Sequence, residues 1–160
     1  MKTYIRSQFL ILLVFSMFVS TSAYGQAYEL QIERVRDKRI LWTHKIEKTD
    51  EFLLKYTHSV DGTPVEERYR CGEDNAIIVD NTRFKMIGAG IEFHPHAGIF
   101  KLDDGWITVS QINRRIERYL LRVGKIARPK IVIHDETVDL LNITSNGDLL
   151  EIKITGRDMD

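Results

Sequence analysis

The stretch EFLLKYTHSVDGTPVEERYRC, residues 51–71, decides the fold. Two runs with the composition of β-strands, 51–60 and 65–71, flank the dipeptide Asp61-Gly62. Glycine tolerates the positive φ angle that tight hairpin turns require, and an Asp-Gly pair between two such runs is a strong hairpin signal. The stretch therefore predicts an antiparallel hairpin at the centre of the chain.

Short runs of the same kind occur on both sides of this hairpin. Residues 28–35 alternate apolar and polar side chains, the period of a strand with one buried face. Residues 109–123 also carry apolar side chains at helical spacing, but we favour strands there. Further strands are expected at 40–46, 76–80, 82–86, 99–102, 106–112, 118–123, 130–134, 137–143 and 149–155. Many short strands separated by turns predict an all-β fold, a small single-domain sandwich or a barrel-like antiparallel sheet.

The N-terminus has the layout of a secretory signal. Lys2 and Arg6 precede the apolar run 9–19, and residues 20–25 are small or polar. This predicts a signal helix over residues 1–25 and one β-rich domain over 26–160, exported to the periplasm or the cell surface. The apolar run is shorter than a membrane-spanning helix requires. An uncleaved N-terminal anchor is the alternative.

Charge and cysteine content exclude several classes of protein. Basic and acidic residues both number 23, so no basic excess points to nucleic acid as a partner. The single cysteine, Cys71, cannot form an internal disulfide, and we expect it to be a small buried strand residue. No motif for a cofactor is present in the sequence, and we expect none to be bound.

The hairpin carries the first candidate site, formed by His58, Ser59, Thr63, Glu66 and Glu67. In an antiparallel pair, cross-strand side chains come within reach of one another. An imidazole beside two carboxylates could bind a cation, hold a ligand carboxyl group or contact a partner protein. The plainer alternative is a cross-strand histidine–glutamate hydrogen bond on a half-exposed sheet face.

Two features follow the hairpin in the sequence. Gly88 and Gly90 enclose an alanine in a glycine-rich loop that could receive an anion, or could simply permit a bulge or a close backbone approach. His94 and His96 bracket a proline and could both reach one metal ion. The metal site that the sequence then suggests consists of His58, Glu66, His94 and His96. Its alternative is an exposed polar loop.

One concentration of basic residues occurs in the sequence. Arg114, Arg115, Arg118 and Arg122 could meet an anionic ligand or acidic lipid headgroups beside a membrane, or form a solvated strand face.

No residue pattern in the sequence points to catalysis. Ser59 directly follows His58, and neighbouring strand residues point to opposite faces, so His58 is poorly placed as its base. We therefore expect no enzyme.

Three motifs carry a resemblance to a known family. They are YTHSVDGTPVEE at residues 56–67, TRFKMIGAG at 82–90 and LLRVG at 120–124. In this combination and order the chain resembles the DUF1850 family of small exported domains, over residues 41–154. The family brings no established catalytic residues. This sequence departs from its pattern after Gly90, where the two additional histidines, His94 and His96, occur.

The resemblance implies a context for the function. Members of the family are found with, or fused to, TRAP-type transporters of the TAXI class, which import organic acids with an extracytoplasmic solute-binding protein. We therefore expect a non-enzymatic periplasmic accessory domain that docks on the transporter's membrane subunit or its solute-binding protein. The hairpin 58–67 and the loop 88–96 would form the docking surface. The alternative is a small ligand- or metal-binding domain that acts independently of any transporter.

Overall fold

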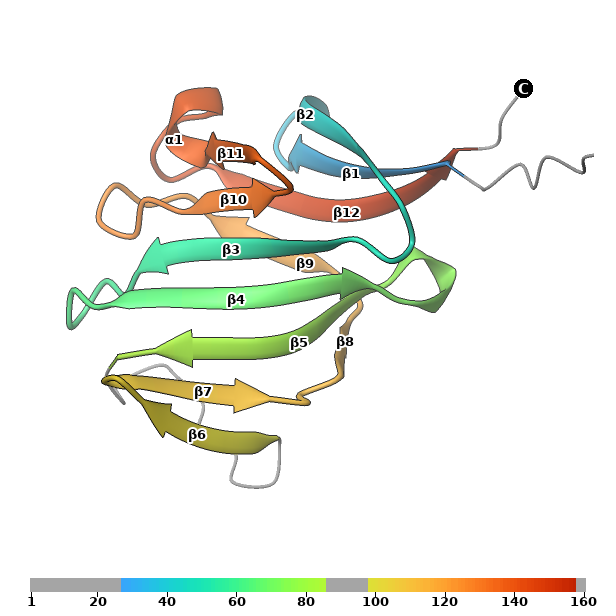
Figure 1. The fold of residues 1–160 in the computed structure, drawn as a ribbon. Helices are drawn as coiled ribbons and strands as arrows, with labels where there is room; N and C mark the ends of the chain where they lie inside the picture. The colour runs from blue at the N-terminus through green and yellow to red at the C-terminus, as the bar shows by residue number, and fades with distance from the viewer. Residues whose placement is uncertain (1–26, 86–97, 158–160) are drawn as a thin grey trace, which may run out of the picture.

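The computed structural model describes residues 27–85 and 98–157. In this part of the chain the fold is all-β, and two antiparallel sheets pack face to face as a sandwich (Figure 1). The strands are β1 (Ala27–Arg34), β2 (Arg39–Ile46), β3 (Glu51–Thr57), β4 (Pro64–Cys71), β5 (Ile77–Phe84), β6 (Ile99–Asp103), β7 (Trp106–Ser110), β8 (Arg114–Ile116), β9 (Tyr119–Arg122), β10 (Lys130–Ile133), β11 (Glu136–Asp139) and β12 (Leu149–Arg157). The all-β prediction is confirmed.

The smaller sheet has the order β2-β1-β12-β9. Its two central strands pair so that Leu30 lies opposite Ile154 and Ile32 lies opposite Ile152. The alternation read from the sequence places these side chains on the inner face, where Leu30 and Ile32 are completely buried. The outer face carries the polar residues between them, Gln31 opposite Lys153.

The larger sheet has the order β11-β10-β3-β4-β5-β7-β6, with β8 also paired to β5. The predicted hairpin is its β3–β4 pair, in register at Lys55 and Glu66. Its turn is longer than a two-residue turn, because β3 ends at Thr57 and β4 begins at Pro64. Gly62 lies in this turn with a φ of +68°, the conformation that the Asp-Gly signal anticipated.

The two sheets do not cover each other completely. The main core lies between the smaller sheet and the β11, β10, β3 and β4 strands of the larger one, with the first half of β5, and a satellite core lies farther along the larger sheet, toward β6 (Figure 1). Val65, Phe84 and Val109 form this satellite core. Cys71 ends β4 in the main core, where it is buried as a free thiol, as expected, and burial raises the pKa of this thiol.

Two predicted elements differ from the structure. Residues 137–143 were expected as one strand, but β11 ends at Asp139 and a short helix, α1 (Leu140–Ile143), follows. The Asp139 side chain accepts a hydrogen bond from the amide of Leu141 and caps that helix. The strands expected at 76–80 and 82–86 are a single strand, β5, whose register against β4 shifts once, between Arg68 and Tyr69.

Residues 1–25, where the signal is expected, lie outside the described residues. Within 27–85 and 98–157, no helix is long and apolar enough to cross a lipid bilayer.

Candidate functional site

The structure separates the candidate residues of the hairpin instead of gathering them. His58 lies in the β3–β4 turn, and its Nδ1 is bonded to the Asp61 carboxylate. The same carboxylate receives a hydrogen bond from the Thr63 hydroxyl at 3.4 Å, while Ser59 is exposed. The expected cross-strand histidine–glutamate bond is therefore wrong. The longer turn leaves His58 beyond the paired strands, beside an acid three residues away.

Glu66 points to the outer face of the larger sheet. Its carboxylate lies 3.3 Å from Lys55 Nζ on β3 and 2.6 Å from Arg83 Nη2 on β5. The guanidinium of Arg83 also lies over the ring of Trp106, 4.6 Å from its centroid. Glu66 is thus satisfied by neighbouring cations on its own sheet.

Glu67 points the other way, into the sandwich. The Tyr69 hydroxyl donates to its carboxylate at 2.6 Å and lies 2.7 Å from the Tyr119 hydroxyl of the opposite sheet. Burial raises the pKa of Glu67, against the opposing effect of the hydrogen bonds from Tyr69 and Tyr56 and of the Arg114 charge. This cluster is a polar contact between the two sheets and holds Glu67 away from any surface that the hairpin turn presents.

Replacing Glu67 by glutamine is expected to make the protein's stability less dependent on pH. Below the ordinary value of 4.5 the folded and unfolded chains both hold the proton. As the pH rises through the higher pKa of the folded state, the buried charge destabilises the wild type only. The melting temperature of Glu67→Gln should therefore rise relative to that of the wild type between pH 5 and pH 8. Glu66→Gln, which loses contacts with two cations, should show no such gain.

Arg115 and Arg118 of the basic cluster pair with Glu117 and Glu151, and Arg122 donates to the Gly147 carbonyl. The glycine-rich loop and the two histidines that follow it fall outside the described residues. Gly88, Gly90, His94 and His96 lie between residues 85 and 98. Of the suggested metal ligands, His58 contacts Asp61 and Glu66 contacts Lys55 and Arg83. In the two described ranges, no group of three or more His, Cys, Asp or Glu residues has the geometry to hold a metal ion.

Four loop segments meet at one end of the sandwich, and we call this surface the loop end: residues 35–39, 58–63, 123–128 and 144–148. The amide of Thr57, beside the hairpin turn, donates to Ala127 of the third segment at 2.8 Å. Gly147 of the fourth segment donates to Val123 at 2.7 Å. The hairpin turn and the loop before β10 project together on the left of Figure 1.

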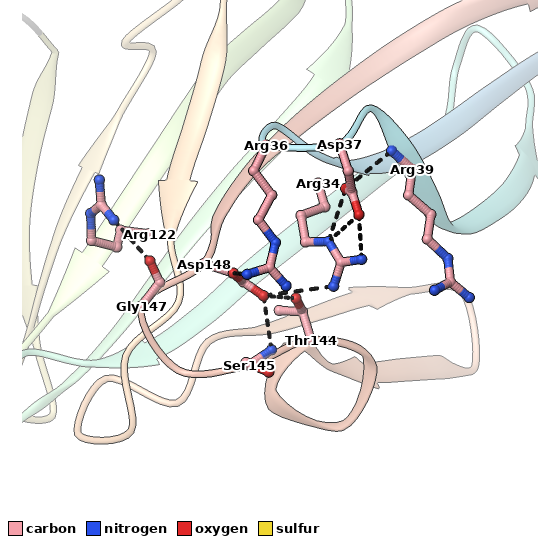
Figure 2. A network of polar contacts seen from close by, with 9 residues as sticks. All are labelled: Arg34, Arg36, Asp37, Arg39, Arg122, Thr144, Ser145, Gly147 and Asp148. Carbon is pink, nitrogen blue, oxygen red and sulfur yellow. Dashed lines mark hydrogen bonds and ion pairs between the residues drawn. The ribbon is translucent and has the colours of Figure 1, made fainter.

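Asp148 joins two of these segments (Figure 2). Its buried carboxylate accepts hydrogen bonds from the Thr144 hydroxyl at 2.5 Å and the Ser145 amide at 3.1 Å. It also lies 3.3 Å from Arg36 Nη1 and 3.9 Å from Arg34 Nη1, across the β1–β2 turn. The Thr144 hydrogen bond is the largest cause that holds the pKa of Asp148 below its ordinary value. One ionised side chain thus fixes the β1–β2 turn to the turn before β12.

The loop end carries two exposed apolar side chains as well as charged residues of both signs. Val60 is 73% exposed in the hairpin turn and Ile126 is 69% exposed in the neighbouring loop. The two side chains lie on neighbouring loops, which the Thr57–Ala127 hydrogen bond ties together. The four segments carry Arg36, Lys38, Arg39, Lys125 and Arg128 against Asp37, Asp61 and Asp148, and two of these cations pair with acids just outside the segments, Lys38 with Glu33 at 3.3 Å and Arg128 with Asp139 at 2.9 Å.

The sequence pointed to part of this surface and missed the rest. The hairpin turn was singled out for its polar residues, but its most exposed apolar residue, Val60, was not. Ile126 and Asp148 were also missed, because the segments that carry them come together only through the strand pairing. An isolated isoleucine between Lys125 and Ala127, outside any alternating run, was the available signal.

Comparison with known proteins places the chain in a family. The family model described as Domain of unknown function (DUF1850) matches residues 52–140, more than half of the chain. The matched part runs from β3 to the first residue of α1 and includes the hairpin turn and the 123–128 loop. No curated protein and no solved structure matches the chain. The chain belongs to the DUF1850 family.

Proposed function

We propose that this protein is a non-enzymatic accessory domain, working outside the cytoplasm, that assists a TAXI-type TRAP transporter of organic acids. It docks through the loop end on the transporter's membrane subunit or on its solute-binding protein. The transporter context rests on the resemblance of the three motifs to the family, and the export rests on the layout of residues 1–25.

One observation supports a docking role above others: the exposed Val60 and Ile126 lie on adjacent loops that a backbone hydrogen bond ties together, on a surface that also carries charged side chains. The turn that carries Val60 is closed by the His58–Asp61 contact and by the His58 amide, which donates to Thr63 at 2.8 Å. A rigid loop loses little conformational freedom on binding, so its apolar contact area translates well into affinity. Interface cores of this kind commonly combine an apolar anchor with a charged rim.

The test is an affinity capture from detergent-solubilised membranes of the native host, read by mass spectrometry, with the full chain as bait. We expect a TRAP membrane subunit or a solute-binding protein to be enriched. Val60→Asp and Ile126→Asp should each reduce that enrichment at least tenfold, because a desolvated carboxylate is costly in an apolar contact. Leu102→Asp is the matched control, since Leu102 is 75% exposed on edge strand β6 and β5 and β7 separate it from the hairpin.

Each other outcome contradicts the proposal. If no transporter component is enriched over a control bait, the accessory role fails. If the Leu102 variant loses the component as strongly as the loop-end variants do, the docking surface lies elsewhere. If the full chain binds protein-free anionic vesicles and Val60→Asp abolishes that binding, the loop end is a lipid contact instead of a protein contact.

A further inference from the structure

A pair of histidines lies where the end strands of the two sheets meet. His44 is on β2, an edge strand of the smaller sheet. Its side chain faces inward, on the same side as Trp42 and Ile46. His134 follows β10 in the turn to β11, which is the last strand of the larger sheet. Nε2 of His44 lies 3.3 Å from Nδ1 of His134.

Each histidine is held by a carboxylate through its other ring nitrogen. Nδ1 of His44 lies 2.8 Å from the Glu136 carboxylate, and Nε2 of His134 lies 3.2 Å from the Asp50 carboxylate. Histidines that ligate metals almost always donate their second ring N–H to a carboxylate, a carbonyl or water, which fixes the tautomer and the ring orientation. The two nitrogens that face each other are therefore the ones whose lone pairs can point toward a shared ion.

The spacing of these two nitrogens suits a shared ion. Imidazole nitrogens bind zinc at about 2.0–2.1 Å, so two of them on a tetrahedral ion lie about 3.3 Å apart. The supporting groups are themselves fixed. The Trp42 indole donates to Glu136 at 2.9 Å and stacks on the ring of His44, and the Glu47 amide donates to Asp50 at 2.8 Å.

We propose that His44 and His134 together bind a late first-row divalent metal ion of the zinc or copper class. The pair supplies two ligands, and water or an external ligand completes the coordination. His134 borders an open cavity of about 390 Å³, lined by Lys45, Ile46, Glu47 and Asp50, which gives such ligands access. This site lies apart from the loop end and goes beyond the docking function proposed above.

A bound ion would join the end strands of the two sheets. An ion that binds only the folded chain raises its stability by mass action. The copper affinity should exceed the zinc affinity, following the usual order for nitrogen ligands.

The experiment is calorimetric titration of the full chain, prepared without a histidine tag, with CuCl₂ and with ZnCl₂. We expect one ion per chain and a rise in melting temperature on binding. His44→Gln and His134→Asn should each weaken binding at least tenfold, and Glu136→Gln by about 10–100-fold. Asparagine suits position 134 because His134 has a φ of +49°, which asparagine tolerates, so this variant keeps the turn. His58→Gln, at the separate Asp61 contact, should bind like the wild type.

Trp42 provides an independent optical signal. Copper at the histidine pair should quench the fluorescence of Trp42, which stacks on His44 with ring centroids 5.5 Å apart. Trp42→Phe should remove this quenching and leave that of Trp106 unaffected. The proposal is overturned if the wild type binds neither ion, or if His44→Gln and His134→Asn bind as tightly as the wild type does. Loss of binding only in His94→Gln or His96→Gln would equally overturn it and place the metal at the other histidines.

Discussion

Replacing Phe84 by alanine is expected to destabilise the protein by about 3–5 kcal/mol, the usual loss for a buried aromatic side chain. Phe84 is 1% exposed on β5 and packs with Val65 and Val109 in the satellite core. The smaller sheet does not cover this core, so few neighbouring side chains can collapse into the cavity that the truncation leaves. Equilibrium unfolding in urea, followed by circular dichroism, measures the change.

Hydrogen exchange should show where the loss falls. Amides of β5 and β7 next to the cavity should exchange faster in Phe84→Ala, while those of β1 and β12 in the main core keep more of their protection. Phe100→Ala is the matched control, because Phe100 is only half-buried at the edge of the same core and should cost less than half as much. Equal losses in the two variants would show that the satellite core does not contribute separately to stability.

The role of Phe84 shows what a family motif does and does not reveal. Phe84 stands in the stretch 82–90 that carries part of the resemblance, and its position could be read as functional. In the structure it is a core residue opposite Val65 on the neighbouring strand. A residue of a family motif can therefore be needed for packing instead of for binding or catalysis. The contacts of each residue in the structure show which of these roles it has.

Most strands could be predicted from local sequence pattern, because a strand's pattern involves only residues that are neighbours in the sequence. Alternation identified β1, and Asp61-Gly62 identified the hairpin. Alternation failed at residues 140–143, where an apolar run that looks like a strand is turned into a helix by the side chain of Asp139. The same rule does place Glu66 and Glu67 on opposite faces, since they are adjacent strand residues.

Sites proved harder to predict, because they depend on which strands meet. His44 and His134 are 90 positions apart and each is isolated in the sequence, so only the edges of the two sheets bring them together. The loop end depends in the same way on the order of strands in both sheets. Sequence pattern gives the face on which a side chain lies, but not the strand from the other sheet that it will meet.

Replacing Asp148 by asparagine should lower the melting temperature markedly at neutral pH. The carboxylate is buried and joins the Thr144 hydroxyl, the Ser145 amide and the guanidinium of Arg36 (Figure 2). Asparagine has the same shape, but it carries no charge, and its amide group turns hydrogens toward a guanidinium. The groups that donate to the buried carboxylate would then lose part of their hydrogen bonding, and this destabilises the fold more than the loss of an exposed contact does.

The pH dependence of this variant separates charge from shape. The folded-state pKa of Asp148 is lower than its ordinary value of 3.8, so the ionised carboxylate stabilises the folded chain above that value. The contribution is lost as the pH falls through the lower, folded-state pKa. The gap in melting temperature between wild type and Asp148→Asn should therefore be widest near pH 7 and close below pH 4.

Asp37→Asn is the control for a surface charge at the same end. Asp37 also pairs with Arg34, at 2.6 Å, and the Arg34 hydrogen bond lowers the pKa of Asp37 to about 2, but its side chain is 42% exposed. Exposed ion pairs contribute little, so this variant should melt close to the wild type. If Asp148→Asn melts no lower than Asp37→Asn at pH 7, burial of the Asp148 carboxylate does not fix the two turns together. The rigidity assigned to that part of the loop end would then be wrong.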